Sequence, residues 1–186
     1  MSEDETAEGI EAEMRQWVQR VVLGLDLCPF AGRPWRDGQV RLEVCLASGV
    51  EGRLTALWTE LDHLFATDGV ETTLLVVPHA PATFDAFLAE TDLADAVTER
   101  AGYDGLVQIV TFHPSFRFAT EAADDPANLV NRSPYAMWHL LRTDRLAEVT
   151  VDDPGLGERV SDANRELLRA MSPAALRSLL GPSQGD

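Results

Sequence analysis

The sequence predicts an α/β domain, with a small, mostly parallel sheet of at least three strands, helices packed on the sheet, and extra helices at the C-terminal end. Residues 40–46 alternate between apolar and polar side chains, as in a half-buried strand, whereas residues 73–77 and 106–112 are almost continuously apolar. Apolar residues at helical spacing over residues 54–65 and 84–97 separate these strands. This alternation favours parallel neighbours joined by crossovers, and a ferredoxin-like α+β sheet with some antiparallel pairing is the alternative.

Further segments carry helical patterns outside this region. Residues 11–25 and 158–171 repeat apolar side chains at helical spacing. Ser133-Pro134 and Ser172-Pro173 each predict the start of a helix, because serine accepts from first-turn N–H groups and proline fits the first helical position. A fourth strand could lie in residues 148–151.

The length of 186 residues and a hydrophobic content of 45% suit one domain with its own core. We expect this domain to span residues 9–180, with disordered tails at residues 1–8 and 181–186, where charge or glycine and serine replace apolar periodicity.

The charge excludes several classes of function. Fifteen basic residues, all of them arginine, oppose 31 acidic residues, so the net charge is −16. This disfavours a nucleic-acid partner, and the absence of lysine excludes a P-loop and Schiff-base chemistry. The acidic N-terminus is unlike a secretory signal, and no apolar run is long enough to span a membrane. The sequence therefore predicts a cytoplasmic protein with no membrane partner, and it does not predict an oligomeric state.

Two histidines follow strand-like segments. His79 comes after the second strand in Pro78-His79, and His113 comes after the third in His113-Pro114. In open parallel sheets, ligands bind beyond the carboxyl ends of the strands, so both rings could reach one ligand there. Histidine titrates near neutral pH and suits general acid–base catalysis, although either ring could instead hydrogen-bond a loop.

The segment after the third strand is a long loop rich in aromatic, asparagine and arginine side chains, which favours an ordered functional loop. It leads to the helix expected at Ser133, whose N-terminus would favour an anion. Residues 28–36 and 112–142 hold five arginines and three acidic residues, a local charge of +2, and the arginine fork suits phosphate or carboxylate. The predicted substrate-binding residues are Arg117, Asn128, Asn131, Arg132, Ser133, Tyr135, His139 and Arg142.

Two alternatives to that anion site stay open. The arginines could pair with Asp124 and Asp125 as a structural network. Tyr135, His139 and Arg142, which would form one stripe on the expected helix, could be a solvated face.

Cys28 is the candidate nucleophile, with a buried structural cysteine as the alternative. His79, His113 and His139 could together hold a divalent metal such as zinc, with Cys28 or Asp125 as a further ligand. No compact metal-binding motif supports this hypothesis of a metal site, so the identity of any cofactor stays open.

Several motifs resemble a known bacterial family, the domain of unknown function 1415. The likeness covers about residues 10 to 172 and lies in Leu27-Cys28-Pro29-Phe30-Ala31, Val76-Val77-Pro78-His79, Phe112-His113-Pro114, Asp124-Asp125-Pro126-Ala127-Asn128 and Asn131-Arg132-Ser133-Pro134-Tyr135. The resemblance implies a bacterial, stand-alone, single-domain protein, and it brings no activity, cofactor or catalytic residue.

These observations favour a small hydrolase or transferase that acts on an anionic metabolite, including a phosphorylated one, at a His/Arg/Cys site on the carboxyl rim of the sheet. His79 or His113 would act as acid–base, and Cys28 as nucleophile. One alternative is a non-catalytic module that binds a small anion. The other is a structural interaction protein, which predicts an exposed apolar patch around Phe116, Phe118 and Trp138.

Overall fold

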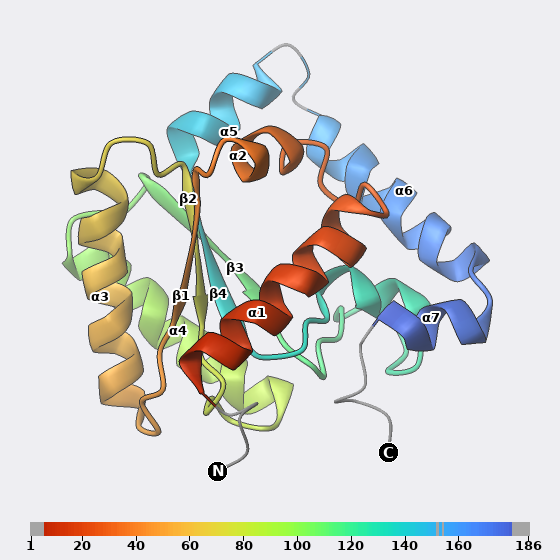
Figure 1. Cartoon of the computed structure of the whole chain (residues 1–186), viewed down its shortest axis with the longest axis horizontal. Helices are drawn as coiled ribbons and strands as arrows, with labels where there is room; N and C mark the ends of the chain where they lie inside the picture. Colours follow the sequence, from red (N-terminus) through yellow and green to blue (C-terminus); the bar gives the residue numbers. More distant parts are fainter. Residues whose placement is uncertain (1–5, 152, 154, 180–186) are drawn as a thin grey trace.

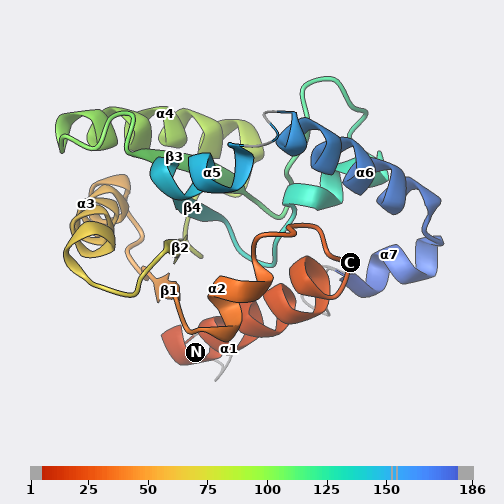
Figure 2. The ribbon, with the colours of Figure 1, turned by 90° about the horizontal axis from the view of Figure 1, so that it is seen from above.

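The computed structural model describes residues 6–151, 153 and 155–179. In this part of the chain, a four-stranded sheet lies between two layers of helices (Figures 1 and 2). Helices α3 (Val50–Ala66) and α4 (Phe84–Arg100) cover one face. Helix α1 (Ala7–Trp17), which continues into the π-helix η2 (Val18–Leu23), covers the other.

The sheet is mixed, so the α/β class is confirmed but the prediction of a mostly parallel sheet is wrong. The strands are β1 (Val40–Val44), β2 (Thr72–Val76), β3 (Val107–Phe112) and β4 (Met137–Arg142), in the spatial order β1-β2-β4-β3. β1 and β2 are parallel, whereas β4 lies antiparallel between β2 and β3. The antiparallel pairing of the ferredoxin-like alternative is thus present beside one parallel pair.

β4 replaces the helix that Ser133-Pro134 predicted. The Ser133 hydroxyl donates to the Tyr135 carbonyl oxygen at 2.5 Å, so it holds a turn and does not cap a helix. The strand is apolar on both faces, because it lies in the middle of the sheet. The fourth strand considered for residues 148–151 is also wrong, since helix α5 (Thr143–Thr150) occupies that region.

The other predicted elements are confirmed with small changes in their bounds. The strands and the helices that connect β1 to β3 follow the chain order expected for them. The Ser172-Pro173 prediction is correct: Ser172 Oγ accepts from the N–H of Ala175 at 3.2 Å, and helix α7 (Pro173–Leu179) begins there. Helix α6 (Leu156–Ala170) precedes α7, and the short helix α2 (Gly32–Arg36) precedes β1.

Each face of the sheet has its own core. Along β4, Met137 points into the core beneath α1, whereas Trp138 and Leu140 point into the core beneath α3 and α4. This alternation follows from the two-residue period of a strand, and it determines which side chains of neighbouring elements can meet on each face of the sheet.

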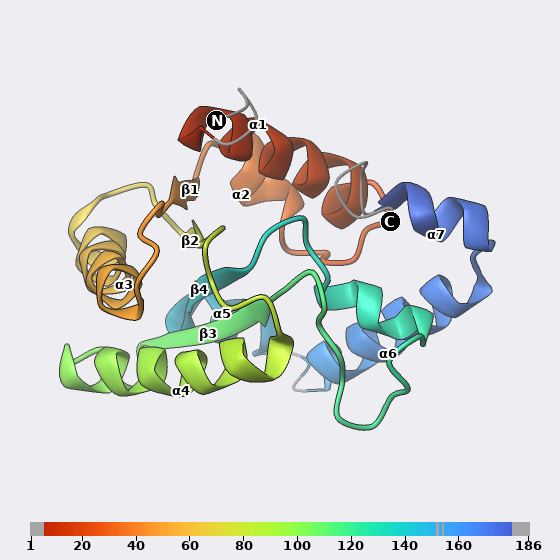
Figure 3. The same ribbon diagram turned by 90° about the horizontal axis from the view of Figure 1, so that it is seen from below.

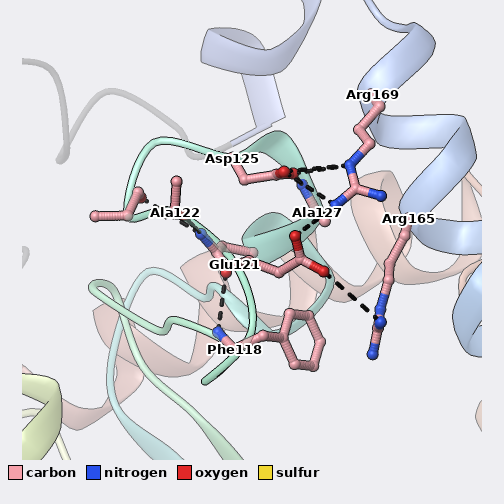
Figure 4. Close-up of polar contacts among 9 residues, drawn as sticks. Phe118, Glu121, Ala122, Asp125, Ala127, Arg165 and Arg169 are labelled. Carbon is pink, nitrogen blue, oxygen red and sulfur yellow. Dashed lines mark hydrogen bonds and ion pairs between the residues drawn. The ribbon is translucent and has the colours of Figure 1, made fainter.

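The C-terminal helices pack beside the sheet and hold the long loop that precedes the 3₁₀ helix η3 (Pro126–Asn131), as Figure 3 shows. The Arg169 guanidinium on α6 pairs with Asp125 at 2.9 Å and with Glu121 at 2.6 Å (Figure 4). Asn164 on the same helix donates to the Leu27 carbonyl oxygen at 2.6 Å. Ion pairs therefore hold the loop against α6. This agrees with the alternative that arginines pair with Asp125 in a structural network, but Arg169 was not among the arginines considered.

Helix α1 begins at Ala7, two residues before the expected start of the domain. Of the two expected tails, residues 1–5 and residues 181–186 lie outside the described residues. Among the described helices, none combines the length and the apolar character needed to cross a bilayer.

Candidate functional site

The main candidate site is an apolar cavity of about 280 Å³ between the sheet and the N-terminal helices. Its floor is the α1-side face of the four strands. Its walls and roof are α1, η2, α2, α5 and the loop that joins η2 to α2. The lining residues are Trp17, Val18, Val22, Cys28, Phe30, Ala31, Pro34, Trp35, Val40, Thr72, Leu74, Val110, Phe112, Met137, His139, Leu141 and Leu146. We call this space the apolar cavity.

The end of η2 bends the chain back over the apolar cavity. The Leu27 N–H donates to the Val22 carbonyl oxygen at 2.9 Å, a bond that spans five residues and belongs to the π-helical pattern. Asp26 then takes a left-handed conformation with φ of 54°, which aspartate tolerates better than most residues. This reversal places Cys28 on the cavity wall. Single-turn π-helices and positive φ values often occur at functional sites.

His139 is the main polar group of the cavity. Its Nε2 lies 2.8 Å from Thr72 Oγ1, and that hydroxyl donates its one hydrogen to the Leu140 carbonyl oxygen at 2.6 Å. Thr72 must therefore accept from His139, so we assign the hydrogen to Nε2 and a lone pair to Nδ1. Burial lowers the pKa of His139 to about 4. The ring is neutral at pH 7.

Cys28 and Trp17 are the other polar groups on the wall. Burial raises the pKa of the Cys28 thiol, so this cysteine is protonated near neutral pH. The Trp17 side chain is 2% exposed, and its Nε1 has no hydrogen-bond partner among the described residues. An unsatisfied buried N–H costs about 1–3 kcal/mol, so it calls for a functional or structural reason.

A more polar cleft of about 320 Å³ adjoins the apolar cavity and shares Phe30, Pro34, Thr72, Leu141 and Leu146 with it. The additional residues of this cleft, which we call the outer cleft, include Arg33, Glu71, Arg142, Arg145 and Glu148.

The cationic residues of the outer cleft are paired with carboxylates. Arg142 pairs with Asp144 at 2.7 Å and Arg145 with Glu148 at 3.0 Å. Arg33 is highly exposed and lies 3.6 Å from a carboxylate oxygen of Glu71.

The two histidines predicted at the strand ends do leave the sheet at the same edge, because β2 and β3 run in the same direction on either side of β4. His113 is 2% exposed, and both of its ring nitrogens are engaged: Nε2 lies 3.0 Å from the Pro81 carbonyl oxygen, and Nδ1 accepts from the Ser115 N–H at 2.9 Å. Burial lowers the pKa of His113. The His79 side chain is exposed, and its backbone carbonyl accepts from Arg53.

The predicted asparagines hold the long loop in place. Asn128 is fully buried; its Oδ1 accepts from the Phe118 N–H at 2.9 Å and its Nδ2 donates to the Ala122 carbonyl oxygen at 2.8 Å. Asn131 Nδ2 donates to the Thr111 carbonyl oxygen at 3.0 Å. These contacts join loop to loop and loop to β3, so both amides are engaged by the protein itself.

Arg117 and Arg132 line the same surface cleft. With Thr83, Asp85 and Ser115, they line a cleft of about 310 Å³ at the carboxyl rim of β2 and β3, which we call the rim cleft. Arg132 donates to the Phe116 and Ala123 carbonyl oxygens at 3.0 and 2.8 Å. It has no carboxylate partner among the described residues, and burial lowers its pKa.

Three sequence-based groupings are not formed. His139 and Arg142 project to opposite faces of β4, and Tyr135 precedes that strand, so the expected helical stripe does not exist. His113 packs on Phe87 of α4, whereas His139 packs on Phe112 on the α1 side.

Consequently, the described residues contain no group of three or more histidine, cysteine or acidic side chains placed to hold a metal, and the proposed zinc ligands are not brought together. The apolar patch of the interaction hypothesis is also not formed as expected, because Phe116 and Trp138 are buried, at 9% and 0% exposed.

Sequence reasoning missed Trp17, Thr72 and the apolar residues as parts of a site. Trp17 fits the apolar face of a helix, and Thr72 opens a strand, so nothing local marks either as a ligand contact. It also missed the buried ion pair of Arg53 and Glu90, whose signal was two charges on otherwise apolar helix faces.

Fold and site together define a mixed α/β protein with an apolar cavity beneath its N-terminal helix and two polar clefts. The chain belongs to the family described as protein of unknown function DUF1415, whose model matches residues 9–178. The family resemblance of the sequence motifs is thereby confirmed. No curated protein and no solved structure matches the chain.

Proposed function

We propose that the protein binds a small, mostly apolar molecule in the apolar cavity. The observation that carries this proposal is a cavity of about 280 Å³ whose few polar groups include a half-buried, neutral histidine. Apolar pockets with a few convergent polar groups and shifted pKa values are typical ligand sites. The volume lies just below the usual range for ligand pockets, about 300–1,000 Å³, so a one- or two-ring molecule suits it.

Filling the cavity should abolish binding. Naphthalene, a purely apolar probe, is expected to shift the backbone NMR signals of residues around the cavity. In Val22→Trp, an indole ring would occupy the space, and naphthalene affinity should fall at least tenfold.

Val97→Trp is the matched control. Val97 lies on α4, where it lines a surface cleft on the opposite side of the sheet. This variant should bind naphthalene like the wild type. Absence of naphthalene binding to the wild type, or equal binding to Val22→Trp, would contradict the proposed site.

The state of Cys28 separates binding from catalysis. Because burial raises its pKa, labelling of Cys28 by iodoacetamide should have a pH midpoint above that of an ordinary cysteine. A Cys45→Ala background leaves Cys28 as the remaining cysteine. A midpoint below that of an ordinary cysteine would instead favour a nucleophile, and with it the hydrolase or transferase expected from the sequence.

The rim cleft supports a second candidate function, the binding of a small anion such as phosphate. The specific observation is the half-buried Arg132 guanidinium, which lacks a described carboxylate partner while Arg117 lines the same cleft. Asp85, on this cleft 3.8 Å from Arg117, opposes the site in part.

Phosphate titration at constant ionic strength should shift the backbone signals of Phe84 and Ser115, and Arg132→Gln should weaken this response at least fivefold. Arg117→Gln should weaken it less, because Arg117 is more exposed and is already near Asp85. Arg100→Gln, at the other end of α4, serves as the control. An undiminished response in Arg132→Gln would exclude this cleft as the anion site.

A further inference from the structure

We propose that the molecule bound in the apolar cavity is uncharged and carries one hydroxyl group, which donates a hydrogen bond to Nδ1 of His139. This inference rests on the proposed function and names the chemical class of its ligand: a small, mostly apolar alcohol or phenol. It departs from the anion that the sequence predicts.

The hydrogen count at His139 leaves one ring nitrogen as an acceptor. Thr72 uses its hydrogen on the Leu140 carbonyl oxygen, so the imidazole must donate through Nε2. Nδ1 is then an acceptor, and no described residue donates to it. The ring is only partly buried by surface area, and it lines the cavity. A ligand that carries a donor can therefore satisfy Nδ1.

The wall of the cavity is uncharged. None of its 17 lining residues carries a formal charge while Cys28 and His139 are neutral. A carboxylate or phosphate placed there would lose its hydration with no cation to replace it, which is far costlier than burying a hydroxyl that is hydrogen-bonded.

The outer cleft is the place where an acidic ligand could otherwise put its head group. Arg142 and Arg145 already pair with Asp144 and Glu148, and Glu71 lies on the same surface. An incoming anion would have to displace or approach these carboxylates. The outer cleft therefore gives an acid little advantage over an alcohol.

The experiment compares three probes of one skeleton on the whole chain at pH 7: naphthalene, 1-naphthol and 1-naphthoate. Affinities come from NMR titration. We expect 1-naphthol to bind about tenfold more tightly than naphthalene, and 1-naphthoate to bind at least tenfold more weakly than 1-naphthol. In His139→Leu, the advantage of 1-naphthol over naphthalene should vanish while naphthalene still binds. Since the variant keeps an apolar side chain, naphthalene binding also reports that the cavity remains folded.

The outcomes separate the two proposals. If none of the probes binds, the proposed function fails. If naphthalene binds and 1-naphthoate binds as well as 1-naphthol or better, the cavity is a binding site but the uncharged ligand class is wrong. Equal affinities of naphthalene and 1-naphthol, or an unchanged preference in His139→Leu, would overturn the assignment of His139 as the acceptor.

Discussion

Replacement of Arg53 by methionine is expected to lower the free energy of unfolding by about 3–5 kcal/mol, the largest effect of any variant considered for this protein. Arg53 on α3 and Glu90 on α4 are 4% and 6% exposed. Two parallel bonds join them, with Nε–Oε1 at 2.5 Å and Nη2–Oε2 at 2.6 Å. The variant would leave the Glu90 carboxylate buried without its partner. Urea unfolding at pH 7 measures the loss.

This pair also fixes the loops that follow β1 and β2. Arg53 Nη1 donates to the Ala47 and His79 carbonyl oxygens at 3.3 and 3.0 Å. Both of these residues lie three positions beyond the ends of the parallel strands, so one guanidinium organises the carboxyl rim there. Methionine can replace the packing of the arginine stem but none of these four hydrogen bonds.

Two further variants distinguish the effect of this buried ion pair from that of an ordinary exposed ion pair. Arg53→Met combined with Glu90→Leu should recover much of the lost stability, because no isolated charge stays buried. Arg15→Met, which breaks the exposed pair with Glu11, should cost at most about 1 kcal/mol. If Arg53→Met were as mild as Arg15→Met, the pair would have no special role in the fold.

Local sequence patterns were sufficient for most of the fold. The order of β1, α3, β2, α4 and β3 follows from apolar periodicity and from the residues that end each element. The failure lies at β4, and two similar dipeptides show its cause. Ser172 accepts from an N–H three residues ahead and begins a helix, whereas Ser133 donates to the Tyr135 carbonyl oxygen and holds a turn. The difference is tertiary, since β4 gains partners on both edges that no local pattern reveals.

That single failure also changed the predicted site. With residues 137–142 in a helix, Tyr135, His139 and Arg142 share a face, but in a strand His139 turns toward α1 and Arg142 toward α3. His79 and His113 nevertheless follow the ends of β2 and β3, and Arg117 and Arg132 line one cleft. The apolar cavity was beyond such reasoning, because an unfilled volume depends on how α1 and η2 pack on the sheet rather than on any residue type.

The lowered pKa of His139 predicts how stability depends on pH. The pKa of His139 is about 4 in the folded protein, against 6.5 for an ordinary histidine, so the unfolded chain binds a proton more readily between these values. Its contribution is fully present above pH 6.5 and is lost as the pH falls toward 4. Each pKa unit corresponds to about 1.4 kcal/mol, so the loss reaches about 3 kcal/mol. Because the ring is only half-buried and faces the cavity, this free energy is an upper value.

Comparison with a variant isolates this contribution, because His113, whose pKa is also lowered, acts in the same direction. Urea unfolding at pH 7.5 and pH 4.5 should show a loss for the wild type that is about 2–3 kcal/mol greater than for His139→Leu. His79→Gln, which removes an exposed imidazole, should keep the wild-type difference. Equal losses for the wild type and His139→Leu would mean that the ring is hydrated in the folded protein. The cavity would then hold water, and its preference for an apolar ligand would disappear with the burial that supports it.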